Sequence, residues 1–258
     1  MNGTPDARPD RWLRWYRRVA TPRLRLVCLP HAGGAPSLFR DWSAGLPADV
    51  EVVAVCYPGR QDRLAEPCVD DMGVLSTVIA DVLLPYHGPR LALFGHSMGA
   101  SVAYEVALRL QQRTDTGVAG LFVSGQLPPH RVVPSDVHRQ GDDAILAAVR
   151  QLGDPGAEAV LADPDLRELV LPAIRADFRL IGGYQPRPVT PLRGPVAAYA
   201  GADDPDVPAA GLREWAAATA DGPFHHRTLP GNHFYLIPGA APLLADLSER
   251  LAELPAPG

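Results

Sequence analysis

A serine in a glycine-flanked turn is the residue of this chain best suited to covalent chemistry. Ser97 is the centre of a G-x-S-x-G sequence at residues 95–99, which lies between a predicted strand at residues 91–94 and a predicted helix that starts near Ala100. A sharp strand-to-helix turn holds such a serine in a strained backbone conformation, so nearby positions must be glycine. A plain packing turn of small residues has the same pattern, but the place between strand and helix favours a nucleophile.

The general base for this serine is predicted from chain order. A serine hydroxyl is a weak nucleophile at neutral pH, and its base follows the serine and an acid along the chain in this kind of site. His233 comes directly after the turn at residues 230–232, which ends a strand-like run. Active sites of open α/β sheets gather at such loops, so we predict His233 as the base. The remaining downstream histidines either precede any candidate acid strand or lie within the strand-like run: His130, His138, His225 and His226.

The acid that orients the base should follow the strand before His233. The apolar run at residues 196–200 leads into a loop that contains Asp203 and Asp204. The carboxylate must accept a hydrogen bond from the imidazole, and a shift of one residue points the side chain elsewhere. The residues alone leave both aspartates open, and the one that is not used is expected to be a surface turn residue.

Two backbone amides are candidates for an oxyanion hole. The Met98 N–H lies at the start of the helix after Ser97, where free amide donors and the helix dipole favour developing negative charge. The second donor should come from the loop after the first strand, and the glycine-containing loop at residues 30–34 places the Ala32 N–H there. A plain glycine turn is the alternative explanation for this loop.

The elements that must position these residues alternate along the chain. Short apolar runs rich in valine and leucine are typical of parallel strands covered on both faces, and segments of helical length lie between several of them. The predicted strands are residues 24–29, 50–55, 91–94, 121–123 and 196–200, and the predicted helices include residues 74–84 and 100–110. This alternation indicates an α/β protein with a mostly parallel, doubly wound sheet.

The alternation stops after residue 123. Residues 142–152 and 165–181 have the pattern of two amphipathic helices with no strand between them, and segments rich in glycine and proline bracket them. We therefore predict a helical insertion at residues 128–185 within one α/β core made of residues 1–127 and 186–258.

Composition limits the compartment and the partners. The chain has 258 residues and a formal net charge of −5, so no general attraction to nucleic acid or to an anionic membrane is expected. The first 18 residues lack the apolar stretch of about 7 to 15 residues of a secretory signal, and no run approaches the roughly 18 apolar residues of a membrane span. With three cysteines and no metal-binding spacing, we expect a cytoplasmic monomer without metal or cofactor.

Five segments of the chain together form a recognisable set: LPHAGG at residues 29–34, YPGR at 57–60, FGHSMGA at 94–100, DFR at 177–179 and GNHFY at 231–235. With these segments the chain resembles the stand-alone type II thioesterases of polyketide and nonribosomal peptide synthesis, which are α/β-hydrolases with a helical lid. The resemblance runs from about Trp15 to the carboxyl end. The first two segments are more specific than the serine motif, which most α/β-hydrolases share.

The resemblance implies an editing hydrolase that removes aberrant acyl groups from the phosphopantetheine arm of acyl or peptidyl carrier proteins. The family's acid lies in a Gly-x-x-Asp pattern, which matches Gly201 and Asp204 and so favours Asp204. Family members commonly have arginine after the Ser-Gly that precedes the lid, whereas this chain has Gln126. Lid contacts and acyl preference therefore do not carry over from the resemblance.

Two other functions stay open at this point: another serine esterase, lipase, peptidase or acyltransferase, and a non-catalytic binding member of the fold. The helices of the insertion could line an acyl channel with their apolar faces or simply cover the core. Arginines near the amino terminus and after the second strand could meet an acidic carrier protein, although such clusters are usually solvated faces: Arg11, Arg14, Arg17, Arg18, Arg60 and Arg63.

Overall fold

The computed structural model of the chain describes residues 7–87, 90–153, 155–237 and 239–254. Its centre is a seven-stranded sheet in which the strands have the order β1-β3-β2-β4-β5-β6-β7. The strands are β1 (Leu13–Trp15), β2 (Leu24–Leu29), β3 (Val50–Val55), β4 (Arg90–His96), β5 (Gly120–Ser124), β6 (Val196–Gly201) and β7 (Phe224–Leu229). The five strands predicted from sequence are all present, to within one or two residues at each end.

The sheet is parallel except at one edge, where β1 runs antiparallel to β3. From β2 the chain first adds β3 on one side and then returns to add β4, β5, β6 and β7 on the other. The strand order therefore reverses between β2 and β4. In open α/β sheets this switch point leaves a crevice at the carboxyl ends of the strands, where ligands bind.

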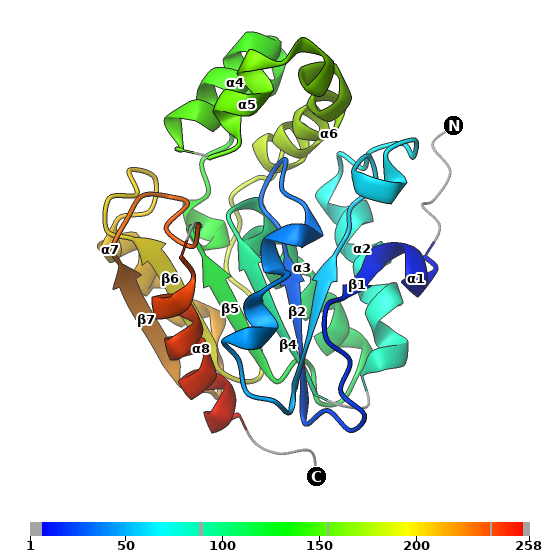
Figure 1. Cartoon of the computed structure of the whole chain (residues 1–258). Helices are drawn as coiled ribbons and strands as arrows, with labels where there is room; N and C mark the ends of the chain where they lie inside the picture. Colours follow the sequence, from blue (N-terminus) through cyan, green and yellow to red (C-terminus); the bar gives the residue numbers. More distant parts are fainter. Residues whose placement is uncertain (1–6, 88–89, 154, 238, 255–258) are drawn as a thin grey trace.

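Helices cover both faces of the sheet, which explains why the inner strands β2 to β6 are nearly continuous apolar runs. On one face α2 (Met72–Leu83) packs against α3 (Met98–Arg113), and on the other lies α8 (Ala241–Glu253) (Figure 1). The short helices α1 (Pro9–Trp12) and α7 (Ala209–Arg213) lie near the two edges of the sheet. The doubly wound α/β prediction is thus confirmed, while β1 and α8 were not anticipated.

Between β5 and β6 the described residues form three α-helices and no strand: α4 (Asp142–Gln151), α5 (Ala157–Ala162) and α6 (Pro164–Gly182). They gather at one end of the sheet, apart from the helices that cover its faces (Figure 1). The Asp163 carboxylate caps α6 by accepting from the Asp165 and Leu166 amides, and Pro164 supplies a preset φ in the first turn. The two predicted helices are α4 and α6, and α5 was missed.

The boundaries 128 and 185 of the helical insertion stay a prediction. No helix in the described ranges is long and apolar enough to cross a membrane.

Candidate active site

The Ser97 turn has the strained geometry that its sequence predicts. β4 ends at His96, α3 begins at Met98, and Ser97 between them has φ 54° and ψ −123°. A side chain at Gly95 would overlap the Gly99 carbonyl, and one at Gly99 would overlap the Leu29 carbonyl. Both glycines are therefore required by close backbone approach, and the turn leaves Ser97 partly accessible among buried neighbours.

His233 and Asp204 lie together at the carboxyl ends of β7 and β6. The His233 Nδ1 is 2.8 Å from the Asp204 Oδ2, and both residues are buried. Burial alone would raise the pKa of Asp204, but the hydrogen bond with His233 and those from the Asp206 and Val207 amides hold this pKa below its usual value. The carboxylate thus stays charged and fixes Nδ1 as the protonated ring nitrogen.

The structure distinguishes the two candidate aspartates. Asp203 is exposed, and its backbone N–H donates to the Gly231 carbonyl at 2.9 Å. Its side chain has no contact with His233 among the described residues. The Nε2 of His233 is buried and has no hydrogen-bond partner in the described part of the chain. Asp204 is therefore the carboxylate placed to orient His233, whose Nε2 is left available to a hydroxyl or a ligand.

A second buried histidine lies beside His233 and was missed by the sequence analysis. The ring centroids of His96 and His233 are 5.1 Å apart. His96 Nδ1 is 2.9 Å from the Ser124 Oγ, which is 2.7 Å from the Tyr235 hydroxyl. Burial lowers the pKa of His96 well below its usual value, and the neighbouring His233 and His31 lower it further. His96 and Tyr235 lie within the two motifs that carry Ser97 and His233, but no spacing rule indicates that Ser124 joins them.

The two predicted oxyanion donors lie on segments that pack directly against each other. The first turn of α3 touches the backbone carbonyls of Leu29 and Pro30, as the tight space around Gly99 shows. In the described residues neither the Ala32 N–H nor the Met98 N–H has a hydrogen-bond partner. Both amides are thus available to a ligand at the switch point between β2 and β4.

The helical insertion touches the loops that carry these residues at two places. Ile174 of α6 lies against Gly33 in the loop after β2, and Gly153 after α4 lies against the Asn232 side chain, next to His233. Ile174 is buried, whereas Leu169, another apolar residue of α6, is half exposed. Only part of the apolar face of α6 therefore contacts this end of the sheet.

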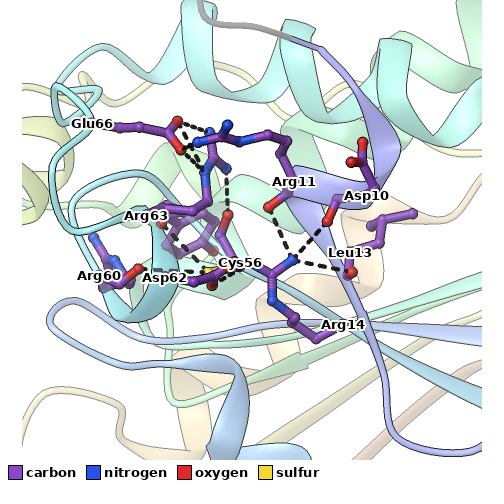
Figure 2. A network of polar contacts seen from close by, with 10 residues as sticks. Asp10, Arg11, Leu13, Arg14, Cys56, Arg60, Asp62, Arg63 and Glu66 are labelled. Atoms are coloured by element: carbon purple, nitrogen blue, oxygen red, sulfur yellow. Dashed lines mark hydrogen bonds and ion pairs between the residues drawn. The ribbon is translucent and has the colours of Figure 1, made fainter.

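Most of the arginines suggested for partner docking are occupied within the chain. Arg63 is 1% exposed, and Figure 2 shows it bonded to the Cys56 carbonyl and to Glu66. Arg14 donates to the Asp62 carboxylate at 2.5 Å, and Arg17 donates to three backbone carbonyls. Arg60 is buried as well. Arg60 and Arg63 are buried, so the docking interpretation of these two was wrong. Arg14 and Arg17 are partly exposed, and for them it stays a prediction.

Comparisons with known proteins show the family to which the chain belongs. The family model described as "Thioesterase domain" matches residues 24–251. Thioesterase PikA5 of Streptomyces venezuelae is 42% identical over 241 residues, which cover 93% of this chain and 85% of that protein. The solved RedJ thioesterase from the prodiginine biosynthetic pathway in Streptomyces coelicolor superposes with a TM-score of 0.81 at 40% identity, covering 89% of this chain and 86% of that one. The type II thioesterase BorB from the borrelidin biosynthetic cluster gives 0.84 at 39% identity, covering 97% and 100%.

The sheet order, the helical insertion and the serine turn after β4 define an α/β-hydrolase fold. The chain belongs to the thioesterase family, because the family model spans most of its length. It is therefore a hydrolase of thioesters, and the resemblance to type II thioesterases is confirmed.

Proposed function

We propose that this chain hydrolyses acyl thioesters on the phosphopantetheine arm of acyl or peptidyl carrier proteins and so clears aberrant acyl groups from polyketide or nonribosomal peptide synthases. The observation that carries the catalytic part is the buried His233–Asp204 hydrogen bond of 2.8 Å, with the His233 ring packed near His96, the residue that precedes the strained Ser97. The similar thioesterases from the prodiginine biosynthetic pathway and the borrelidin biosynthetic cluster support the substrate class. We expect the enzyme to act in the cytoplasm, together with the carriers.

In the proposed reaction His233 acts first as a base. Its Nε2 takes the hydroxyl proton of Ser97 while the Oγ bonds to the thioester carbonyl carbon, and the Ala32 and Met98 amides stabilise the oxyanion. The C–S bond then breaks, and His233 returns the proton to the departing thiolate. Asp204 holds the ring and stabilises its protonated form.

The second half of the proposed reaction frees the acid. A water molecule gives a proton to His233 while its oxygen bonds to the acyl carbon. The acyl–oxygen bond to Ser97 breaks, and the Oγ recovers the proton from His233. In this mechanism the protein supplies every acid and base, and no cofactor takes part.

Mass spectrometry of acylated carrier proteins tests this function. Carriers with different acyl groups are incubated with the wild type and with Ser97→Ala, beside the matching simple esters. Rapid loss of the acyl group that depends on Ser97 is the expected result. Turnover of esters alone would instead assign the chain to a different substrate class. Labelling of the wild type, and not of Ser97→Ala, by a fluorophosphonate probe identifies the nucleophile independently.

A further inference from the structure

The loop that carries Ala32 is held in place by groups from other parts of the chain. The Tyr57 hydroxyl donates to the Pro30 carbonyl at 3.2 Å, and Arg60 Nη1 donates to the Gly34 carbonyl at 2.9 Å. The Gly33 N–H donates to the Asp177 Oδ2 at 2.8 Å. Two of these three groups, Arg60 and Asp177, also bind each other.

The Arg60–Asp177 pair is a buried, two-pronged ion pair. Arg60 Nη1 and Nη2 donate to the two carboxylate oxygens of Asp177, each at 2.9 Å, and the residues are 7% and 2% exposed. Burial would lower the pKa of Arg60, but the Asp177 carboxylate raises it, so the guanidinium stays charged. Buried ion pairs are often no more stabilising than apolar residues of similar size. A contribution to folding stability alone therefore does not explain why the chain buries this ion pair.

The two partners come from different parts of the chain. Asp177 lies on α6 of the helical insertion, whereas Arg60 lies in the segment after β3. That segment is fixed by the network in Figure 2, where Arg63 donates to the Cys56 carbonyl at 2.7 Å and pairs with Glu66, which in turn binds Arg11. This network holds the segment that carries Arg60. Because Arg60 binds Asp177, it also links α6 to this segment.

We propose that Arg60 and Asp177 are positioning residues that fix the Gly33 and Gly34 backbone, and thereby aim the adjacent Ala32 N–H at the oxyanion. This inference rests on the proposed function, because it assumes the Ser97 oxyanion. The carboxylate occupies the Gly33 N–H, which would otherwise be a competing donor, and the guanidinium fixes the Gly34 carbonyl. Arg60 and Asp177 thus hold the loop after Ala32, and Tyr57 holds the Pro30 carbonyl before it. The donor is then fixed before a substrate arrives, as electrostatic preorganisation requires.

A second ion pair on the same helix provides a matched control. Arg179 Nη1 of α6 lies 2.6 Å from the Asp70 Oδ2, just before α2, so this pair also joins the helical insertion to the core. Both side chains are substantially exposed, and in the described residues neither one forms a hydrogen bond or ion pair with the loop at residues 30–34. Loss of this pair tests whether any weakened link between insertion and core has the same effect.

The test compares two double variants with identical residue changes. Arg60→Met with Asp177→Leu removes the buried pair without leaving an unpaired charge, and Arg179→Met with Asp70→Leu removes the exposed one. Steady-state kinetics use an acylated carrier protein and an acyl-N-acetylcysteamine thioester. Inhibition by an acyl trifluoromethyl ketone, which forms a tetrahedral adduct with the serine, reports on the oxyanion site itself. Thermal unfolding checks that each variant is folded.

The first variant is expected to lose about 10- to 100-fold in kcat, part of what the loss of one oxyanion donor costs, with KM within threefold. Its inhibition constant for the ketone should rise by a similar factor, and the control should match the wild type in both. Unchanged kcat and ketone affinity in the first variant would overturn the inference, as would equal losses in the control. If this variant does not fold, Arg60→Lys replaces it, because lysine keeps the charge but cannot make the two-pronged hydrogen bond to Asp177. We expect Arg60→Lys to lower kcat and to raise the inhibition constant for the ketone by about tenfold each.

Failure of the proposed function gives a different pattern. Wild-type protein that leaves acylated carriers intact but binds the ketone through Ser97 would refute the carrier substrate. The ketone affinities of the variants would still decide whether Arg60 and Asp177 position the oxyanion loop.

Discussion

Two buried histidines lie side by side at the carboxyl ends of β4 and β7, and they differ in one partner. His233 and His96 each have an Nδ1 in a hydrogen bond, and in the described residues each has a buried Nε2 without one. The partner of His233 is the Asp204 carboxylate, whereas that of His96 is the Ser124 hydroxyl. A carboxylate stabilises a protonated ring and a hydroxyl does not, so only His233 is equipped to accept and hold a proton.

Replacing each histidine with asparagine tests most directly whether only His233 acts as a base. We expect His233→Asn to lower kcat by about 10⁴- to 10⁶-fold, because no other base reaches Ser97 in the proposed mechanism. His96→Asn should reduce kcat by less than about tenfold, since the amide can replace the ring Nδ1 in its bond with Ser124. Thioester hydrolysis by the purified variants measures both effects. Comparable losses in the two would mean that His96 also takes part in proton transfer.

Removing only the charge beside His233 is the next test. We expect Asp204→Asn to lower kcat by about 10⁴-fold, because the amide favours the wrong tautomer of His233 and cannot stabilise its protonated form. Asp203→Asn is the matched control, as Asp203 is the exposed neighbour in the same loop, and its kcat should stay at the wild-type value. A large loss in Asp203→Asn, or a small one in Asp204→Asn, would reverse the assignment of the acid.

The choice between these aspartates also shows what sequence could and could not predict. Apolar runs bounded by turns located five strands, because strands buried on both faces have a distinct composition. The short edge strand β1 has too few residues to show a pattern. The residues left Asp203 and Asp204 open, and resemblance to a family favoured Asp204. Which side chain faces His233 depends on the local bend after β6, which the structure supplies.

Contacts between distant segments were beyond the sequence analysis for a different reason. Asp177 and Arg60 are 117 positions apart and lie in separate motifs of the family resemblance, so nothing in their spacing indicates that they form an ion pair. The arginines near the amino terminus are a similar case. Their clustering gave no sign that Arg14 and Arg17 donate to acidic and carbonyl oxygens of the same chain.

The hydroxyl beside His96 should matter for stability more than for turnover. Ser124→Ala leaves the His96 Nδ1 and the Tyr235 hydroxyl without their shared partner in a buried site. We expect the free energy of unfolding to fall by about 1–3 kcal/mol, with kcat within a fewfold of the wild type. Urea unfolding at pH 7 measures the first quantity, and thioester hydrolysis at low temperature measures the second. A loss of kcat above 100-fold at unchanged stability would place this hydroxyl in the reaction and remove the distinction between the histidines.

The smallest expected effect is on the pH dependence of the free energy of unfolding, through the buried His31. Burial lowers the pKa of His31 from 6.5 to about 3, and the neighbouring His233 and Arg60 contribute to the shift. Between these pH values the unfolded chain binds a proton at this position and the native chain does not. The free energy of unfolding must therefore fall as the pH drops below 6.5, by up to about 1.4 kcal/mol per pH unit for one such group.

Replacing His31 should flatten this dependence. Between pH 7 and pH 5.5 the wild type is expected to lose about 1 kcal/mol more stability than His31→Gln, measured as the difference between urea unfolding free energies at the two pH values. His226→Gln is the control, because His226 is exposed on β7 and should leave the dependence unchanged. An equally steep loss in His31→Gln would show that His31 is protonated in the native state. His31 would then not be a histidine that burial keeps neutral, and it would no longer differ in this respect from His233 beside its carboxylate.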